Sequence, residues 1–303
     1  MAVAEETRIL TLSHSPDPDD AFTWWGLVSG RVRVPGVRFE VTPRTMEQAN
    51  RACLAERVDV AAISSAAWPH FSRKYAILGS GASVGRGYGP AVASRVCSSV
   101  AELDRATVAL PGSMTTGALL FRLFHPLAAT IEKPCSAVAE AIVNGDVEGG
   151  VLIHEELMNY AHKGLRRLEC LGRRWLDETG LPIPVGLIAV HRRLGEELIA
   201  RIAAAVAESV ECGFRHRDKA LTYAMNFSTQ AVDGIGVDFV RMFTNEDTLA
   251  LPEDCLAALR LLYAKAYVAD LIPELPPVNP VYPGKREPKP SRVGLDWDYQ
   301  YAI

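Results

Sequence analysis

The feature that most constrains the fold is the alternation of short apolar segments with amphipathic ones over the first two thirds of the chain. Apolar runs at residues 9–12, 37–41 and 58–63 predict strands, and helix signals follow each of them. Such alternation predicts an α/β fold with a mostly parallel sheet. Helical patterns dominate the last third, and the longest runs from about residue 195 to residue 214.

Two extended segments, at residues 89–95 and 181–190, are flanked by proline or glycine, and the prolines of the second exclude a helix. We interpret them as paired crossovers between two lobes, each a central sheet flanked by helices, with a cleft between them. Lobe 1 would then comprise residues 1–90 and 191–271, and lobe 2 residues 91–190. Such a division suits a site that closes on a ligand and excludes water.

The C-terminal segment, residues 272–303, changes to proline and charge without an apolar period, which predicts an extended tail. Its last aromatic residues, Trp297, Tyr299 and Tyr301, predict docking on the body or on a neighbouring subunit. The oligomeric state therefore stays open, with a homodimer as one expectation.

Composition excludes several classes of protein. The 303 residues carry a net charge of −4 without a stripe of Lys or Arg, so no nucleic-acid partner is expected. No apolar run approaches the ~20 residues of a membrane span, and no secretory signal is visible at the N-terminus. The six cysteines are scattered without metal-site or disulfide spacing, which favours a cytoplasmic protein without a metal.

A predicted strand at residues 150–153 ends abruptly at His154. Ligands of open α/β sheets bind beyond the carboxyl ends of strands, and histidine is suited to proton transfer near neutral pH. His154 is therefore a candidate general base; the alternative is a histidine that caps the next helix or satisfies a buried carbonyl. The neighbouring Glu155 is a poor candidate to orient it, because adjacent side chains of a strand point to opposite faces.

Polar residues also follow the first and third predicted strands. Ser15, Asp17 and Asp19 lie in a proline-containing loop, and Ser64 and Ser65 end the third strand. The aspartates of the loop would repel an anion, so we expect the loop to meet hydroxyl groups of a ligand or not to contact the ligand at all. The alternative for Asp17 and Asp19 is turn formation and helix capping alone.

The best predicted anion site is the turn from a strand at residues 107–110 into a helix. Ser113, Thr115 and Thr116 bring hydroxyls, free backbone N–H groups and the positive end of a helix dipole together. Capping of the helix is the alternative, and it can coexist with binding. Arg86, between two glycines, is the second group expected to meet a carboxylate, although an ordinary surface position is the alternative.

These candidates divide between two walls of the predicted cleft. A ligand with a carboxylate at one end and sugar-like hydroxyls at the other fits both walls. One wall would carry Ser15, Asp17, Asp19, Ser64, Ser65 and Arg86, and the other Thr115, Thr116 and His154.

Five motifs in matching order resemble the 1,4-dihydroxy-6-naphthoate synthase family of the futalosine route to menaquinone. The similarity runs from about residue 9 to 198 and more loosely to about residue 269. The motifs are S-x-S-P-x-P-x-D at residues 13–20, G-R-G-Y-G-P at 85–90, P-G-x-x-T-T at 111–116, V-L-I-H-E at 151–155, and the stretch from Trp175 through G-L-P-I-P-x-G at 180–186.

The resemblance implies the periplasmic-binding-protein type 2 fold and a cytoplasmic enzyme of menaquinone biosynthesis. Its substrate would be cyclic dehypoxanthinyl futalosine, which carries a benzoate carboxylate and ribose-derived hydroxyls. The family's histidine, matched by His154, is taken to start ring opening and aromatisation to 1,4-dihydroxy-6-naphthoate as a general base. The resemblance implies a lyase-type reaction without a metal or organic cofactor.

The chain departs from the family's usual S-P-C-P-N-D-T loop. Asp17 replaces the usual cysteine, Asp19 the usual asparagine, and Ala21 the usual threonine. Besides a sister enzyme of the same pathway that dehydrates chorismate, which the motifs match less well, two alternative hypotheses accompany the synthase. One is a non-catalytic binding protein for a small carboxylate, and the other is a divergent enzyme of the family that acts on another small carboxylate.

Overall fold

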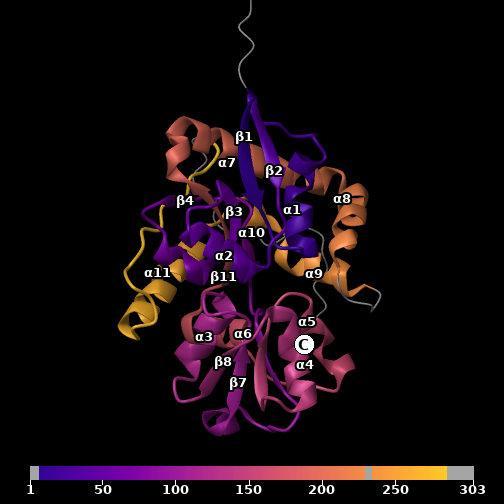
Figure 1. The fold of residues 1–303 in the computed structure, drawn as a ribbon, viewed down its shortest axis with the longest axis vertical. Coiled ribbons are helices and arrows are strands. Elements are labelled where there is room, and N and C mark those ends of the chain that lie inside the picture. Colours follow the sequence, from indigo (N-terminus) through magenta and orange to yellow (C-terminus); the bar gives the residue numbers. More distant parts are fainter. Residues whose placement is uncertain (1–6, 229–233, 285–303) are drawn as a thin grey trace, which may run out of the picture.

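The protein consists of two lobes stacked along its long axis (Figure 1). The computed structural model describes residues 7–228 and 234–284. Within these residues each lobe has its own sheet with flanking helices, so the predicted two-lobed α/β architecture is confirmed.

The sheet of lobe 1 has the strand order β2-β1-β3-β11-β4, and β5 pairs separately with β11. Its strands combine the N-terminal part of the chain with a segment that returns from lobe 2. They are β1 (Arg8–Ser13), β2 (Val37–Val41), β3 (Val60–Ser64), β4 (Tyr75–Ile77), β5 (Ser83–Gly85) and β11 (Ile183–His191).

The sheet of lobe 2 has the strand order β10-β6-β9-β7-β8. Helices α3 and α4 both contact its strand β9, and α4 also contacts β7. The elements of the lobe are β6 (Ala91–Ser94), β7 (Thr107–Leu110), α3 (Thr116–Phe124), β8 (Ala129–Glu132), α4 (Cys135–Asn144), β9 (Gly149–Leu152), α5 (Glu156–Asn159), β10 (Arg166–Cys170) and α6 (Leu171–Thr179).

The prediction of a mostly parallel sheet is wrong, because both sheets are mixed. Strands β1, β2 and β3 pair in parallel, as do β7, β8 and β9. In contrast, β11 pairs antiparallel with β3, β4 and β5, and β6 pairs antiparallel with β9 and β10. The chain enters lobe 2 through β6 and returns to lobe 1 through β11. These two strands, which follow the crossings between the lobes, are the ones that pair antiparallel with their neighbours.

The two crossings run side by side. Residue Gly85 of β5 lies opposite Ile183 of β11, so the outgoing and returning chains are paired where they leave lobe 1. A continuous hydrophobic cluster also joins the lobes, with Ile63 of β3 and Val92 and Val151 of lobe 2 fully buried in it. The lobes are therefore connected by two adjacent chain segments and by shared packing.

The helices of the last third cover lobe 1. Helix α7 packs along α1, and α9 reaches toward lobe 2, where it contacts α5. With α1 and α2, the helices of this lobe are α1 (Pro18–Val28), α2 (Met46–Leu54), α7 (Glu196–Arg215), α8 (Arg217–Ala224), α9 (Ile235–Phe243), α10 (Glu246–Leu249) and α11 (Glu253–Val268).

The described part of the C-terminal segment is extended and packs on lobe 1. Val281 forms a parallel bridge with Leu78, and the indole Nε1 of Trp68 donates to the carbonyl of Pro277 at 3.0 Å. The predicted extended backbone is therefore present up to residue 284. The aromatic residues at 297, 299 and 301 lie outside the described residues.

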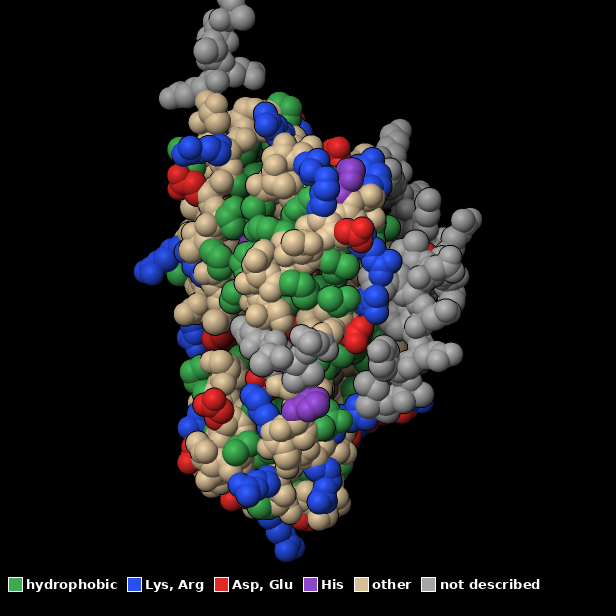
Figure 2. All heavy atoms as spheres, turned by 90° about the vertical axis from the view of Figure 1, so that its right-hand side faces the viewer, with side chains coloured by type: hydrophobic (Ala, Val, Ile, Leu, Met, Phe, Trp, Pro, Cys, Tyr) green, Lys and Arg blue, Asp and Glu red, His purple; other side chains and the backbone are tan. Residues whose placement is uncertain are grey.

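The surface carries charges of both signs. Figure 2 shows basic side chains scattered over both lobes on the side of α8, with hydrophobic side chains gathered on the upper lobe. Among the described residues, no helix is both long and apolar enough to cross a membrane.

Candidate active site

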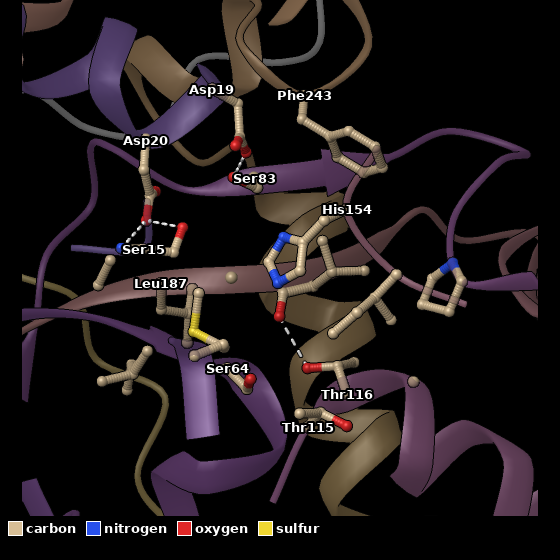
Figure 3. Close-up of a pocket in the computed structure, with 18 of the residues that line it drawn as sticks. Ser15, Asp19, Asp20, Ser64, Ser83, Thr115, Thr116, His154, Leu187 and Phe243 are labelled. Atoms are coloured by element: carbon tan, nitrogen blue, oxygen red, sulfur yellow. Dashed lines mark hydrogen bonds between the residues drawn. The ribbon is translucent and has the colours of Figure 1, made fainter. Parts of the chain in front are cut away.

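A pocket lies where the two lobes meet. Lobe 1 lines it with the loop after β1, the end of β3 and parts of β5 and β11, and lobe 2 with the start of α3 and the residues after β9. Two rings of α9, Phe239 and Phe243, complete the lining. Figure 3 shows the imidazole of His154 within the pocket, between Asp19 and Thr116.

The backbone directs His154 into this pocket by an uncommon conformation. Strand β9 ends at Leu152, and His154 adopts φ +56°, in the left-handed region that non-glycine residues rarely occupy. Such strain costs about 1–3 kcal/mol and clusters at functional sites. The side chain does not cap α5, whose N-cap residue is Glu155 without a side-chain cap. The capping alternative for His154 is therefore not supported.

The side chain that meets His154 comes from the other lobe. Asp17 Oδ2 lies 3.0 Å from His154 Nδ1, and the two side chains are 13% and 20% exposed. Asp17 occupies the N-cap position of α1 but makes no side-chain cap there. Glu155, the sequence neighbour, instead accepts a hydrogen bond from Ser228 Oγ at 2.6 Å.

Two further carboxyl groups of α1 are buried beside the pocket. Ser83 Oγ donates to Asp19 Oδ2 at 3.1 Å, and the backbone N–H and hydroxyl of Ser15 donate to Asp20 Oδ2 at 2.8 and 2.7 Å. Burial, followed by the charges of Asp20 and Asp17, raises the pKa of Asp19 well above its ordinary value. Burial also raises the pKa of Asp20, against the opposing effects of His14 and Ser15. Both shifts favour the neutral form of the carboxyl group.

The start of α3, where an anion site is predicted, lines the pocket. The Thr115 hydroxyl accepts from the Ala118 N–H, so it caps the helix, and the Thr116 hydroxyl donates to the Val185 carbonyl at 2.7 Å. The backbone N–H groups of Thr116 and Gly117 make no hydrogen bond within residues 7–228 and 234–284, as the first turn of a helix leaves them. These amides, rather than the threonine hydroxyls, are the donors available to an anion.

The predicted serines differ in their positions. Ser64 lines the pocket at the end of β3. Ser65 lies behind it, fully buried, and its carbonyl accepts from the hydroxyl of Tyr263. Ser113 precedes the helix, outside the lining, and its carbonyl accepts from Arg122.

Arg86 does not reach the pocket, in contrast to the prediction that it meets a carboxylate of the ligand. Its guanidinium contacts Asp247 at 2.7 Å and Asp254 at 2.8 Å. Although burial lowers the pKa of Arg86, these two carboxylates raise it on balance. The flanking glycines are the local signal behind the prediction. The structure instead pairs the guanidinium with two aspartates far away in the sequence.

The pocket contains groups suited to proton transfer. No group of three or more His, Cys, Asp or Glu side chains able to hold a metal ion is found among the described residues. The pocket combines one imidazole, two buried carboxyl groups and a helix N-terminus with apolar walls. This arrangement can bind an anion at α3 and move a proton at His154.

Comparison with known proteins identifies the family of the chain. The menaquinone biosynthesis family matches residues 10–268 of the chain. The chain belongs to this family. Two curated relatives are named 1,4-dihydroxy-6-naphthoate synthase: one of Streptomyces coelicolor, 32% identical over 90% of this chain and 98% of its own, and one of Thermus thermophilus, 34% identical over 85% and 93%.

Solved structures place this member of the menaquinone biosynthesis family among periplasmic-binding-protein folds. A protein of Archaeoglobus fulgidus is 34% identical, with a TM-score of 0.82 over 87% of this chain and 98% of its own. An alkanesulfonate-binding protein of Xanthomonas axonopodis has a TM-score of 0.66 at 11% identity, over 90% and 98%. The second likeness concerns the fold alone. The predicted family and fold are confirmed.

Proposed function

We propose that this member of the menaquinone biosynthesis family converts cyclic dehypoxanthinyl futalosine to 1,4-dihydroxy-6-naphthoate, with His154 as the general base. The observation that carries the proposal is the imidazole of His154, held by a strained backbone in a pocket between two lobes. The names of the two curated relatives support the product, and the substrate is the one that the sequence resemblance implies.

The geometry of the pocket suits such a substrate. A benzoate carboxylate would accept hydrogen bonds from the Thr116 and Gly117 amides at the positive end of α3. Hydroxyl groups of the sugar would face Ser64 and the carboxyl group of Asp19, whose pKa is raised by burial. Abstraction of a proton by His154 would then start ring opening, and aromatisation of the product would drive the reaction.

We also infer that the enzyme works in the cytoplasm, without a metal or organic cofactor. All six cysteines are free thiols, two of them only partly buried, which suits a reducing compartment.

The test is turnover of purified protein with cyclic dehypoxanthinyl futalosine, followed by the absorbance of the naphthoate. His154→Ala should lower kcat by about 10²–10⁴-fold, the usual contribution of a general base, and should still bind the substrate. The matched control is His162→Ala, which removes an exposed histidine from the same region and should leave kcat unchanged.

Saturable binding without turnover by the parent protein would contradict the proposal and favour a non-catalytic binding protein. Turnover that survives His154→Ala would keep the substrate but exclude His154 as the base.

A further inference from the structure

The contact between His154 and Asp17 is made across the two lobes. Nδ1 and Oδ2 lie 3.0 Å apart, and neither side chain is more than one fifth exposed. The aspartate stands at the start of α1, where aspartates commonly accept a backbone N–H of the first turn. The Asp17 carboxylate makes no such bond, so the helix start does not account for its position.

The chemistry of the pair determines which ring nitrogen can act. An ionised carboxylate only accepts hydrogen bonds, whereas a neutral imidazole donates through one nitrogen and accepts through the other. A carboxylate at Nδ1 therefore favours the proton on Nδ1 and leaves the lone pair on Nε2. No hydrogen bond to His154 Nε2 is present within the part of the chain that the structure describes, so this nitrogen is free to meet a ligand.

We propose that Asp17 is a positioning residue for His154, holding its imidazole as the Nδ1–H tautomer with an unprotonated Nε2 facing the ligand. The inference rests on the proposed role of His154 as a base. Asp17 itself does not touch the reacting atoms in this arrangement. Since the two residues belong to different lobes, the base is complete only when the lobes are together.

Other ionisable groups near Asp17 do not replace it. Asp19 and Asp20 follow it on α1, and both make hydrogen bonds with serines rather than with the imidazole. Cys135, at the start of α4, is a thiol on which the charge of Asp17 acts. Burial, with added effects from the charges of Asp17 and Glu156, raises its pKa, so the thiol stays protonated and does not compete as a base.

The first experiment determines the tautomer of His154 in the wild-type protein. Nitrogen NMR of a sample with ¹⁵N-labelled histidine distinguishes Nδ1–H from Nε2–H in a neutral ring, and His154→Gln assigns the signal. We expect the Nδ1–H tautomer at a pH where the ring is neutral. An Nε2–H tautomer would overturn the proposal. This measurement needs no turnover, so it stands even if the proposed substrate is wrong.

The second experiment replaces Asp17 by asparagine, which is similar in shape but carries no charge and can donate to Nδ1. Asp17→Asn should favour the Nε2–H tautomer and lower kcat on the order of 10²–10⁴-fold, while KM changes little. Asp17→Glu restores a carboxylate and should recover part of kcat. Unchanged kcat in Asp17→Asn, or a loss of kcat with the tautomer unchanged, would overturn the proposal.

The chain offers a matched control in lobe 2. Glu169 Oε2 lies 2.7 Å from His125 Nε2, a histidine–carboxylate pair outside the pocket. Glu169→Gln removes a carboxylate of the same kind and should lower stability without changing kcat. If Asp17→Asn does not fold, the tautomer of the wild-type protein alone decides the proposal.

Discussion

At the scale of single residues, the burial of Asp19 makes stability depend on pH. Because its pKa is raised in the folded protein, the folded state keeps a proton that the unfolded state loses above pH ~3.9. Below that pH, ionisation of Asp19 therefore does not reduce the free energy of unfolding. As the pH rises from there toward the raised pKa of the folded state, the free energy of unfolding falls.

The prediction is that Asp19→Asn, which cannot ionise, gains stability relative to the wild type as the pH rises. The measurement is thermal unfolding of both proteins at about pH 5 and about pH 8. The Tm of the variant, relative to that of the wild type, should be higher at pH 8 than at pH 5. About 1 kcal/mol corresponds to roughly 2–4 °C in a domain of this size class. A difference in Tm that is the same at both pH values would contradict the prediction.

Asp59 provides the matched control. Burial favours its neutral form, but hydrogen bonds from Thr11 and Arg193 outweigh it and lower the pKa. A lowered pKa contributes stability above the unfolded value of about 3.9, and this is lost only as the pH falls through the folded pKa. Asp59→Asn should therefore destabilise the protein by about the same amount at both pH values.

Among single residues, those next to strand ends and helix starts could be predicted from the sequence, because local signals mark them. Four of the residues predicted in this way line the pocket: Ser64, Thr115, Thr116 and His154. The partner of His154 could not be predicted. Asp17 lies far from it in the sequence, and only the way in which the lobes come together brings the two side chains into contact.

At the scale of elements, α1 is the helix that carries the acidic loop to the pocket, and its position depends on close packing against α7. An ideal Cβ at Gly26 would lie 2.7 Å from the Cα of Ser209. The hydroxyl of Ser209 also donates to the Thr23 carbonyl at 2.7 Å and accepts from the Leu27 N–H. The two helices therefore touch through their backbones.

Gly26→Ala should destabilise the protein, since the added methyl group meets backbone rather than a movable side chain. Overpacking of this kind typically costs about 1–3 kcal/mol, from which a gain in helix propensity of up to about 1 kcal/mol is subtracted. A lower midpoint of urea unfolding would measure the loss. The control Glu208→Ala, at an exposed position of α7, should change stability by less than about 0.5 kcal/mol. A Gly26→Ala protein as stable as the wild type would refute close backbone packing here.

Long elements with a clear period could be predicted, and short ones could not. Helix α7 and strands β2 and β7 occur within about a residue of the predicted positions. Strands β4 and β5 contain three residues each, too few for a period to be recognised. The direction of strand pairing could not be predicted either. Strands β6 and β11 have the apolar pattern of ordinary strands, although they run antiparallel to their neighbours.

At the scale of the whole molecule, the site is divided between two lobes that share one pocket. Asp17, Asp19 and Ser64 come from lobe 1, and His154 and the start of α3 from lobe 2. Because two adjacent chain segments connect the lobes, a relative rotation about them would open the pocket without breaking either sheet. The ligand would then hold the lobes together by touching both.

The last prediction is that 1,4-dihydroxy-6-naphthoate, as the product, stabilises and compacts the protein. A ligand at about 100 times its Kd adds about 2.7 kcal/mol to the free energy of unfolding, so Tm should rise with its concentration. Small-angle X-ray scattering should show a smaller radius of gyration at saturation, since both lobes contact the ligand. The N-terminus of α3 is the expected carboxylate site, so naphthalene-1,4-diol, which lacks the carboxylate, should bind more weakly. Tight binding of the product with an unchanged radius of gyration would show that the lobes do not move and that the pair of Asp17 and His154 is preformed.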